Sequence, residues 1–198
     1  GKYFTRRPDG RDIFQEMQAQ GYRVSRSWEK AGALPSGKTL VVAAPGNLPP
    51  PSKRGDVFRQ AAVKALDTLS RNPNGFFLMI EGSNIDKAAH SNNLEEMMEE
   101  LLDFDRTAGA VLDWASKHPG TLVVITADHN TGAFALTGGS REQGEITGRF
   151  GSGSHDGVAV PVYAFGAGSG DFTGIYENTD IFNKIMNALK KGADKPVR

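Results

Sequence analysis

The sequence has 198 residues and contains no cysteine. This absence excludes disulfides, thiolate zinc fingers, cysteine nucleophiles and iron–sulfur clusters. Any bound metal must therefore be held by His, Asp and Glu side chains. Only four histidines are present, so the position of each one is informative.

The chain also has no excess of charge, because 23 basic side chains balance 23 acidic ones. A nucleic-acid-binding protein needs a basic stripe, so nucleic acid is not an expected partner. No apolar run approaches the roughly 18 residues of a membrane span, and no signal peptide is visible, so a membrane is not an expected partner either. The length and the 38% hydrophobic content are typical of one globular domain.

Short apolar runs alternate with helical patterns along the chain. The runs that read as buried strands are residues 39–44, 76–80, 121–126 and 159–165. The segments with helical spacing are residues 9–20, 56–70, 92–117 and 179–191. Residues 45–55 and 132–157 read as long loops. This order predicts an α/β fold with a mostly parallel central sheet flanked by helices, and no domain boundary is visible in residues 1–198.

Ligands of open α/β sheets bind beyond the carboxyl ends of the strands, and three of the four histidines fall beside strand ends. Asp86 and His90 are four residues apart, so a helix would place both on one face. Together with a third ligand they would suit Zn²⁺ with one position left open. Asp128 and His129 follow the third strand, and His155 precedes the fourth.

Simpler interpretations compete with this metal-site hypothesis. A carboxylate–histidine pair is often only a structural hydrogen bond. His118 lies in a Lys-His-Pro-Gly turn and is expected to be exposed.

Glu81 offers a hard oxygen ligand, which suits Mg²⁺ better than Zn²⁺.

Three segments carry motifs that are similar to those of one known family. Residues 76–90, FFLMIEGSNIDKAAH, resemble F-F-L-M-[VI]-E-G-x-x-I-D-x-x-x-H, a signature of the alkaline phosphatase family. Residues 126–132, TADHNTG, are similar to its T-A-D-H-x-T-G segment. Residues 154–157, SHDG, stand where the family has an H-T-G or H-T-A element.

The resemblance implies a site with two zinc ions and one magnesium ion that hydrolyses small phosphomonoesters. Asp86, His90 and His155 would hold the first zinc. Asp128 and His129 would hold the second zinc, and Glu81 would bind magnesium. The resemblance also implies that the intact protein is a homodimer located in the periplasm or outside the cell.

The family's nucleophilic serine segment has no match here, so the chain resembles the C-terminal portion of a single alkaline-phosphatase-like domain. Ser83, Ser152 and Ser154 do not sit in a strand-to-helix elbow and are not expected to replace that nucleophile. We therefore expect the isolated chain to contain no catalytic residue and to be inactive. Two alternatives remain: a phosphodiesterase or phosphate mutase of the same superfamily, and a non-catalytic metal-binding module.

Overall fold

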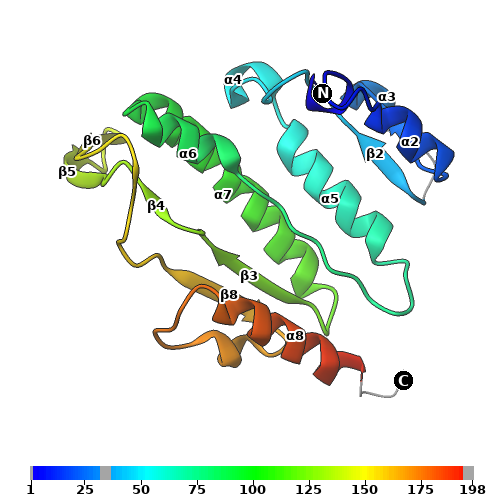
Figure 1. Ribbon diagram of the computed structural model, residues 1–198. Coiled ribbons are helices and arrows are strands. Elements are labelled where there is room, and N and C mark those ends of the chain that lie inside the picture. The colour runs from blue at the N-terminus through cyan, green and yellow to red at the C-terminus, as the bar shows by residue number, and fades with distance from the viewer. Residues whose placement is uncertain (1, 32–36, 194–198) are drawn as a thin grey trace. The chain divides into compact units, whose positions relative to one another are not determined.

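The computed structural model describes residues 2–31 and 37–193 (Figure 1). The chain divides into two compact units, residues 1–75 and residues 76–198, and each is described by itself. The prediction that both belong to one domain stays a prediction. None of the described helices combines the length and the apolar character needed to cross a bilayer.

The first unit contains short helices and one small sheet. Its elements are α1 (Lys2–Thr5), α2 (Ile13–Ala19), β1 (Arg23–Ser25), α3 (Trp28–Ala31), β2 (Thr39–Val41), α4 (Pro51–Arg54) and α5 (Val57–Leu69). Strands β1 and β2 pair in parallel. The first predicted helix starts later than expected because the Asp12 side chain caps it, accepting hydrogen bonds from the backbone N–H groups of Phe14 and Gln15.

The second unit contains two long helices and most of the strands. Its elements are α6 (Ser83–His90), α7 (Leu94–Ser116), β3 (Leu122–Thr126), β4 (Asn130–Thr131), β5 (Ala135–Ser140), β6 (Glu145–Arg149), β7 (His155–Asp156), β8 (Val162–Gly166), the 3-10 helix η1 (Ser169–Phe172) and α8 (Asp180–Ala193). The strand pairs β3–β8, β4–β7 and β5–β6 are all antiparallel. Among the described strands only β1 and β2 are parallel neighbours, so the mostly parallel sheet is not confirmed.

Helices α6 and α7 meet over a small apolar core. Its buried members are Ala88, Ala89 and Met97, and the partly buried side chains around them are Ile85, Leu94, Phe134 and Phe150. Between the helices the Asn93 side chain accepts a hydrogen bond from the Glu96 backbone N–H and so caps α7. This core fixes the position of α6, which carries two of the predicted metal ligands.

Three sequence predictions differ from the structure. The predicted loop 45–55 contains the short helix α4 (Pro51–Arg54). Residues 76–80 are extended but pair with no strand in the described part of the chain, so this predicted strand is not part of a sheet. The apolar pattern indicated an extended backbone, but a sheet also needs a neighbouring strand. The predicted loop 132–157 instead contains the β5–β6 hairpin and strand β7.

Candidate metal centre

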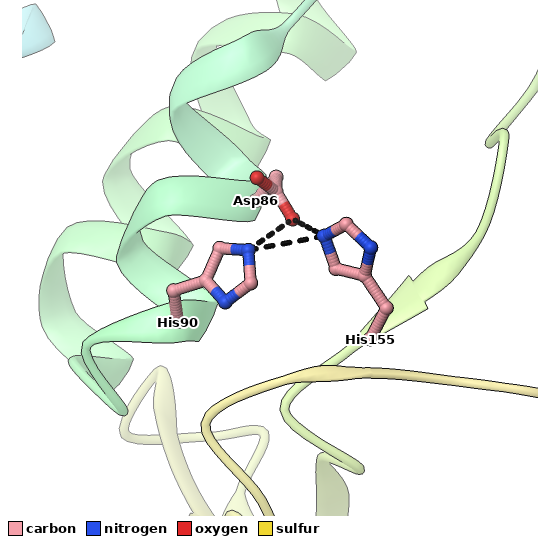
Figure 2. Close-up of side chains that lie close together, drawn as sticks. All are labelled: Asp86, His90 and His155. Carbon is pink, nitrogen blue, oxygen red and sulfur yellow. Dashed lines mark hydrogen bonds and ion pairs between the residues drawn. The ribbon is translucent and has the colours of Figure 1, made fainter.

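Helix α6 and strand β7 bring three of the predicted ligands together (Figure 2). Asp86 and His90 lie one turn apart on α6, and His155 begins β7. Asp86 Oδ1 lies 3.4 Å from His90 Nε2 and 3.5 Å from His155 Nε2. The two Nε2 atoms are 3.0 Å apart. All three side chains are partly open to solvent, so an ion has access to the site.

The shape of this triangle fits a zinc ion. With Zn–N and Zn–O bonds of about 2.0–2.1 Å, two tetrahedral ligand atoms lie about 3.3 Å apart. The three separations in the structure, 3.0, 3.4 and 3.5 Å, bracket that value. Three protein ligands leave a fourth position for water or substrate, as in catalytic zinc sites.

A backbone carbonyl determines which nitrogen His90 presents to this triangle. His90 Nδ1 lies 2.8 Å from the carbonyl oxygen of Gly153. A carbonyl can only accept, so Nδ1 carries the proton and Nε2 carries the lone pair. The lone pair therefore points toward Asp86 and His155. Such a hydrogen bond on the far side of the ring is typical of metal-binding histidines.

A threonine hydroxyl links a second histidine to the triangle. Thr131 Oγ1 donates to Asp86 Oδ1 at 2.7 Å. The same hydroxyl lies 3.1 Å from His129 Nδ1 and, having given its own proton to the carboxylate, accepts from the ring N–H. The other ring nitrogen of His129, Nε2, faces the Asp128 carboxylate. Thr131 was not among the predicted site residues, although it lies inside the 126–132 motif.

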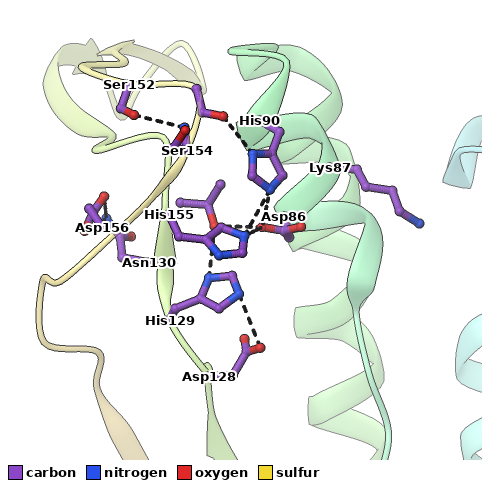
Figure 3. Close-up of polar contacts among 12 residues, drawn as sticks. Asp86, Lys87, His90, Asp128, His129, Asn130, Ser152, Ser154, His155 and Asp156 are labelled. Carbon is purple, nitrogen blue, oxygen red and sulfur yellow. Dashed lines mark hydrogen bonds and ion pairs between the residues drawn. The ribbon is translucent and has the colours of Figure 1, made fainter.

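The predicted second pair lies beside the triangle (Figure 3). His129 Nε2 is 3.3 Å from Asp128 Oδ2, and the His129 ring stacks on His155 with centroids 3.6 Å apart. In the described part of the chain, however, only Asp86, His90 and His155 form a group of three possible metal donors. Asp128 and His129 therefore have no third donor here, and the structure does not bring Glu81 into the group.

Asp156, which was not among the predicted site residues, holds together the strand pair that presents His129 and His155. Its carboxylate accepts from Asn130 Nδ2 at 2.9 Å, from the Ala133 backbone N–H at 3.0 Å and from the Val158 backbone N–H at 3.1 Å. These donors lower the pKa of Asp156, and the backbone N–H of Val158 has the largest effect. Its position next to His155 in the motif was the available signal.

The remaining histidine behaves as the sequence indicated. His118 lies in the exposed turn after α7, where its Nδ1 is 2.7 Å from the Trp114 carbonyl oxygen. Its ring stacks on the Trp114 indole with centroids 3.7 Å apart. His118 is therefore absent from the triangle and serves as a control position for metal binding.

Fold and donors together define a mixed α/β protein with a candidate histidine–carboxylate metal centre. The family model described as alkaline phosphatase matches residues 3–148. The chain therefore belongs to the alkaline phosphatase family. It is 27% identical to alkaline phosphatase 4 of Bacillus subtilis, a match covering 97% of this chain and 57% of that protein. It is 31% identical to streptomycin-6-phosphate phosphatase of Streptomyces griseus, covering 91% and 51%.

Solved structures show the same relationship. Alkaline phosphatase from the Antarctic bacterium TAB5 superposes with a TM-score of 0.85 at 33% identity, over 96% of this chain and 58% of that one. A mutant of the TAB5 enzyme is described with Mg bound. The chain thus spans a little over half the length of these relatives, and the fold is alkaline-phosphatase-like.

Proposed function

We propose that this chain carries the greater part of the metal site of a zinc-dependent phosphomonoesterase. The observation that supports this most directly is the triangle of Asp86 Oδ1, His90 Nε2 and His155 Nε2. Its dimensions suit one zinc ion, and its three residues stand in family motifs. We assign Asp128 and His129 to a second zinc and Glu81 to magnesium, which further ligands would have to complete.

When bound, these ions would supply Lewis-acid activation of an attacking hydroxyl and charge stabilisation of the leaving oxygen. The chain's own residues orient the donors for that purpose. The Gly153 carbonyl holds His90 with Nε2 directed toward Asp86 and His155, and the Thr131 hydroxyl holds the Asp86 carboxylate. The same hydroxyl contacts His129 Nδ1, which leaves Nε2 on the side of Asp128.

The isolated chain is proposed to lack turnover. Among the described residues, no serine hydroxyl hydrogen bonds to any of the six proposed ligand side chains. We assign small phosphomonoesters as the substrates of the intact protein. By family resemblance alone, the intact protein is proposed to be a homodimer in the periplasm or outside the cell.

A zinc titration tests the assignment. The chain competes with a chromophoric zinc chelator, and His90→Ala and His155→Ala are compared with His118→Ala. We expect each ligand variant to weaken the tightest site by more than about tenfold, since loss even of an outer-shell partner typically costs about 10- to 100-fold. His118→Ala should bind as the unchanged chain does. Equal binding by all three variants would contradict the assignment.

Two further measurements separate the alternatives. Histidine ¹⁵N NMR of the metal-free chain should show His90 protonated on Nδ1, and zinc should shift its Nε2 resonance. Zinc-loaded residues 1–198 should not hydrolyse an aryl phosphate. Robust zinc-dependent hydrolysis by this chain would refute the proposed lack of turnover. Hydrolysis of a diester in preference to a monoester would favour the phosphodiesterase alternative.

A further inference from the structure

The turn between α6 and α7 places Asn92 in a left-handed backbone conformation, with a φ of +51°. Helix α6 ends there in two backbone hydrogen bonds of 3.0 Å, from the Asn92 N–H to the Ala89 carbonyl and from the Asn93 N–H to the Ala88 carbonyl. This pattern is the Schellman motif, in which the left-handed residue is usually glycine because a Cβ is disfavoured there. Asparagine at this position therefore needs an explanation beyond ending the helix.

The Asn92 side chain supplies that explanation, since it reaches the loop before His155. One end of its amide faces the carbonyl oxygens of Ser152 and Ala89. Carbonyl oxygens only accept, so this end is the NH2 group, which donates to Ser152 O at 2.7 Å and to Ala89 O at 3.1 Å. Glycine could end α6 as well, but it could not make the contact with Ser152.

The loop of residues 151–154 contacts one proposed metal donor and leads into another (Figure 3). The Gly153 carbonyl lies 2.8 Å from His90 Nδ1, and His155 follows the loop as the first residue of β7. Gly153 also passes so close to the end of α6 that an added Cβ would lie 3.3 Å from the His90 carbonyl oxygen. Movement of the loop away from α6 would therefore release the His90 ring and displace His155.

We propose that Asn92 is a positioning residue of the metal centre. Its side chain holds the Ser152 carbonyl at the end of α6, one residue before the Gly153 carbonyl that orients His90. This contact keeps the Nε2 atoms of His90 and His155 at their separation of 3.0 Å. Asn92 acts on these donors through the loop, and the inference rests on the proposed zinc site.

The composition of the loop makes such a contact effective. Residues 151–154 read Gly-Ser-Gly-Ser, and its two glycines give the free loop many backbone conformations. Binding an ion with donors on a loose loop costs the entropy of ordering that loop, whereas preorganised donors avoid this cost. A hydrogen bond that selects one loop conformation before the ion arrives should therefore raise zinc affinity.

Two substitutions of Asn92 separate this role from helix capping. Asn92→Gly suits the left-handed backbone but loses the contact with Ser152. Asn92→Asp replaces the amide donor by an oxygen that faces two carbonyls. Asn92 is exposed, so both variants should keep the circular dichroism spectrum of the unchanged chain. Zinc affinity of the full 198-residue chain, measured by chelator competition, should fall by about tenfold or more in each variant.

Asn93→Asp is the matched control, because it adds the same charge at the next residue. The Asn93 side chain works as an acceptor, taking a hydrogen bond from the Glu96 N–H at 3.1 Å, and aspartate caps a helix about as well as asparagine. We expect Asn93→Asp to bind zinc at least as tightly as the unchanged chain, because a nearby carboxylate attracts the cation. A loss confined to Asn92→Asp would then come from the missing donor.

A second measurement needs no metal. The His90 Nδ1–H is bonded to the Gly153 carbonyl, so ¹⁵N NMR of the metal-free chain should show it exchanging slowly with water. If Asn92 holds the loop, this exchange should become at least about tenfold faster in Asn92→Gly and Asn92→Asp, because the loop opens more often. It should stay slow in Asn93→Asp. A side chain that only caps α6 would leave the exchange unchanged.

Three results would overturn the proposal. The first is unchanged exchange of the His90 Nδ1–H in both Asn92 variants, whatever their zinc affinity. The second is zinc binding by Asn92→Gly as tight as that of the unchanged chain. The third is an equal loss of zinc affinity in Asn93→Asp and Asn92→Asp. If the unchanged chain binds no zinc, the proposed function fails, and the exchange measurement still decides whether Asn92 positions His90.

Discussion

Gly132 occupies a position where an added methyl group has a calculable effect. It is buried, its φ is +81°, and a Cβ there would lie 2.8 Å from Phe150 Cδ1 and 3.1 Å from the Ala89 carbonyl oxygen. The left-handed conformation costs an alanine about 1–2 kcal/mol. The overpacking adds about 1–3 kcal/mol. We therefore expect Gly132→Ala to lower the free energy of unfolding by about 2–5 kcal/mol.

The same substitution should disturb the metal centre. The Gly132 N–H donates to the Ser154 carbonyl at 3.0 Å, and its own carbonyl accepts from the Gly151 and Ser152 N–H groups. These bonds join the end of β4 to the loop that precedes His155. Displacement of Gly132 away from the Ala89 carbonyl would separate His155 from Asp86, so zinc affinity should fall together with stability.

Gly168→Ala is the matched control. Gly168 has a similar φ of +77°, but nothing lies within 4 Å of a Cβ added there. It should lose only the backbone contribution of about 1–2 kcal/mol and should bind zinc normally. Urea unfolding, followed by circular dichroism, and chelator competition measure both quantities. If Gly132→Ala is no more destabilising than Gly168→Ala and binds zinc equally well, the reasoning from close packing is wrong.

Three further predictions concern other parts of the second unit. Met97→Ala removes a side chain from the buried core of α6 and α7 and should lower the free energy of unfolding, measured in urea, by about 2–5 kcal/mol. Ile175→Ala changes an exposed residue and should alter that free energy by less than about 0.5 kcal/mol. Similar effects of the two substitutions would contradict the assigned core. Asp156→Asn replaces one of the two accepting carboxylate oxygens by an N–H donor, so zinc affinity measured by chelator competition should fall by about 10- to 100-fold. Unchanged affinity would show that the Asp156 carboxylate does not position the metal ligands. The pKa of Asp171 is lowered chiefly by its hydrogen bond to Lys191, whose Nζ lies 2.7 Å from Asp171 Oδ2. This pair therefore stabilises the fold at pH values above the ordinary pKa of aspartate. The contribution disappears as the pH falls through the lowered pKa. Carboxyl NMR should therefore show the pKa of Asp171 rising toward 3.8 in Lys191→Gln, and an unchanged value would exclude the ion pair in solution.

The longer helices were predictable because their signals are local, whereas the four-residue helices α1, α3 and α4 were not predicted. Helix α7 was expected over residues 92–117 and occupies Leu94–Ser116, since apolar spacing, the Asn93 cap and the following turn all lie within its own sequence. The strands were less predictable. Residues 76–80 have the composition of a buried strand, but pairing depends on a neighbour that composition does not specify. The β5–β6 hairpin was missed because its glycines and polar residues resemble a loop.

The sequence by itself, with no cysteine and only four histidines, determined which side chains could bind a metal. The four-residue spacing indicated that Asp86 and His90 would share a face if their segment were helical, as α6 is. Only the tertiary structure decided that His155, 65 positions from His90, completes the triangle. It also decided the ring orientations, through the Gly153 carbonyl and the Thr131 hydroxyl. Helical periodicity acts within one turn of backbone, whereas convergence of distant donors depends on strand pairing and core packing, which no local pattern encodes.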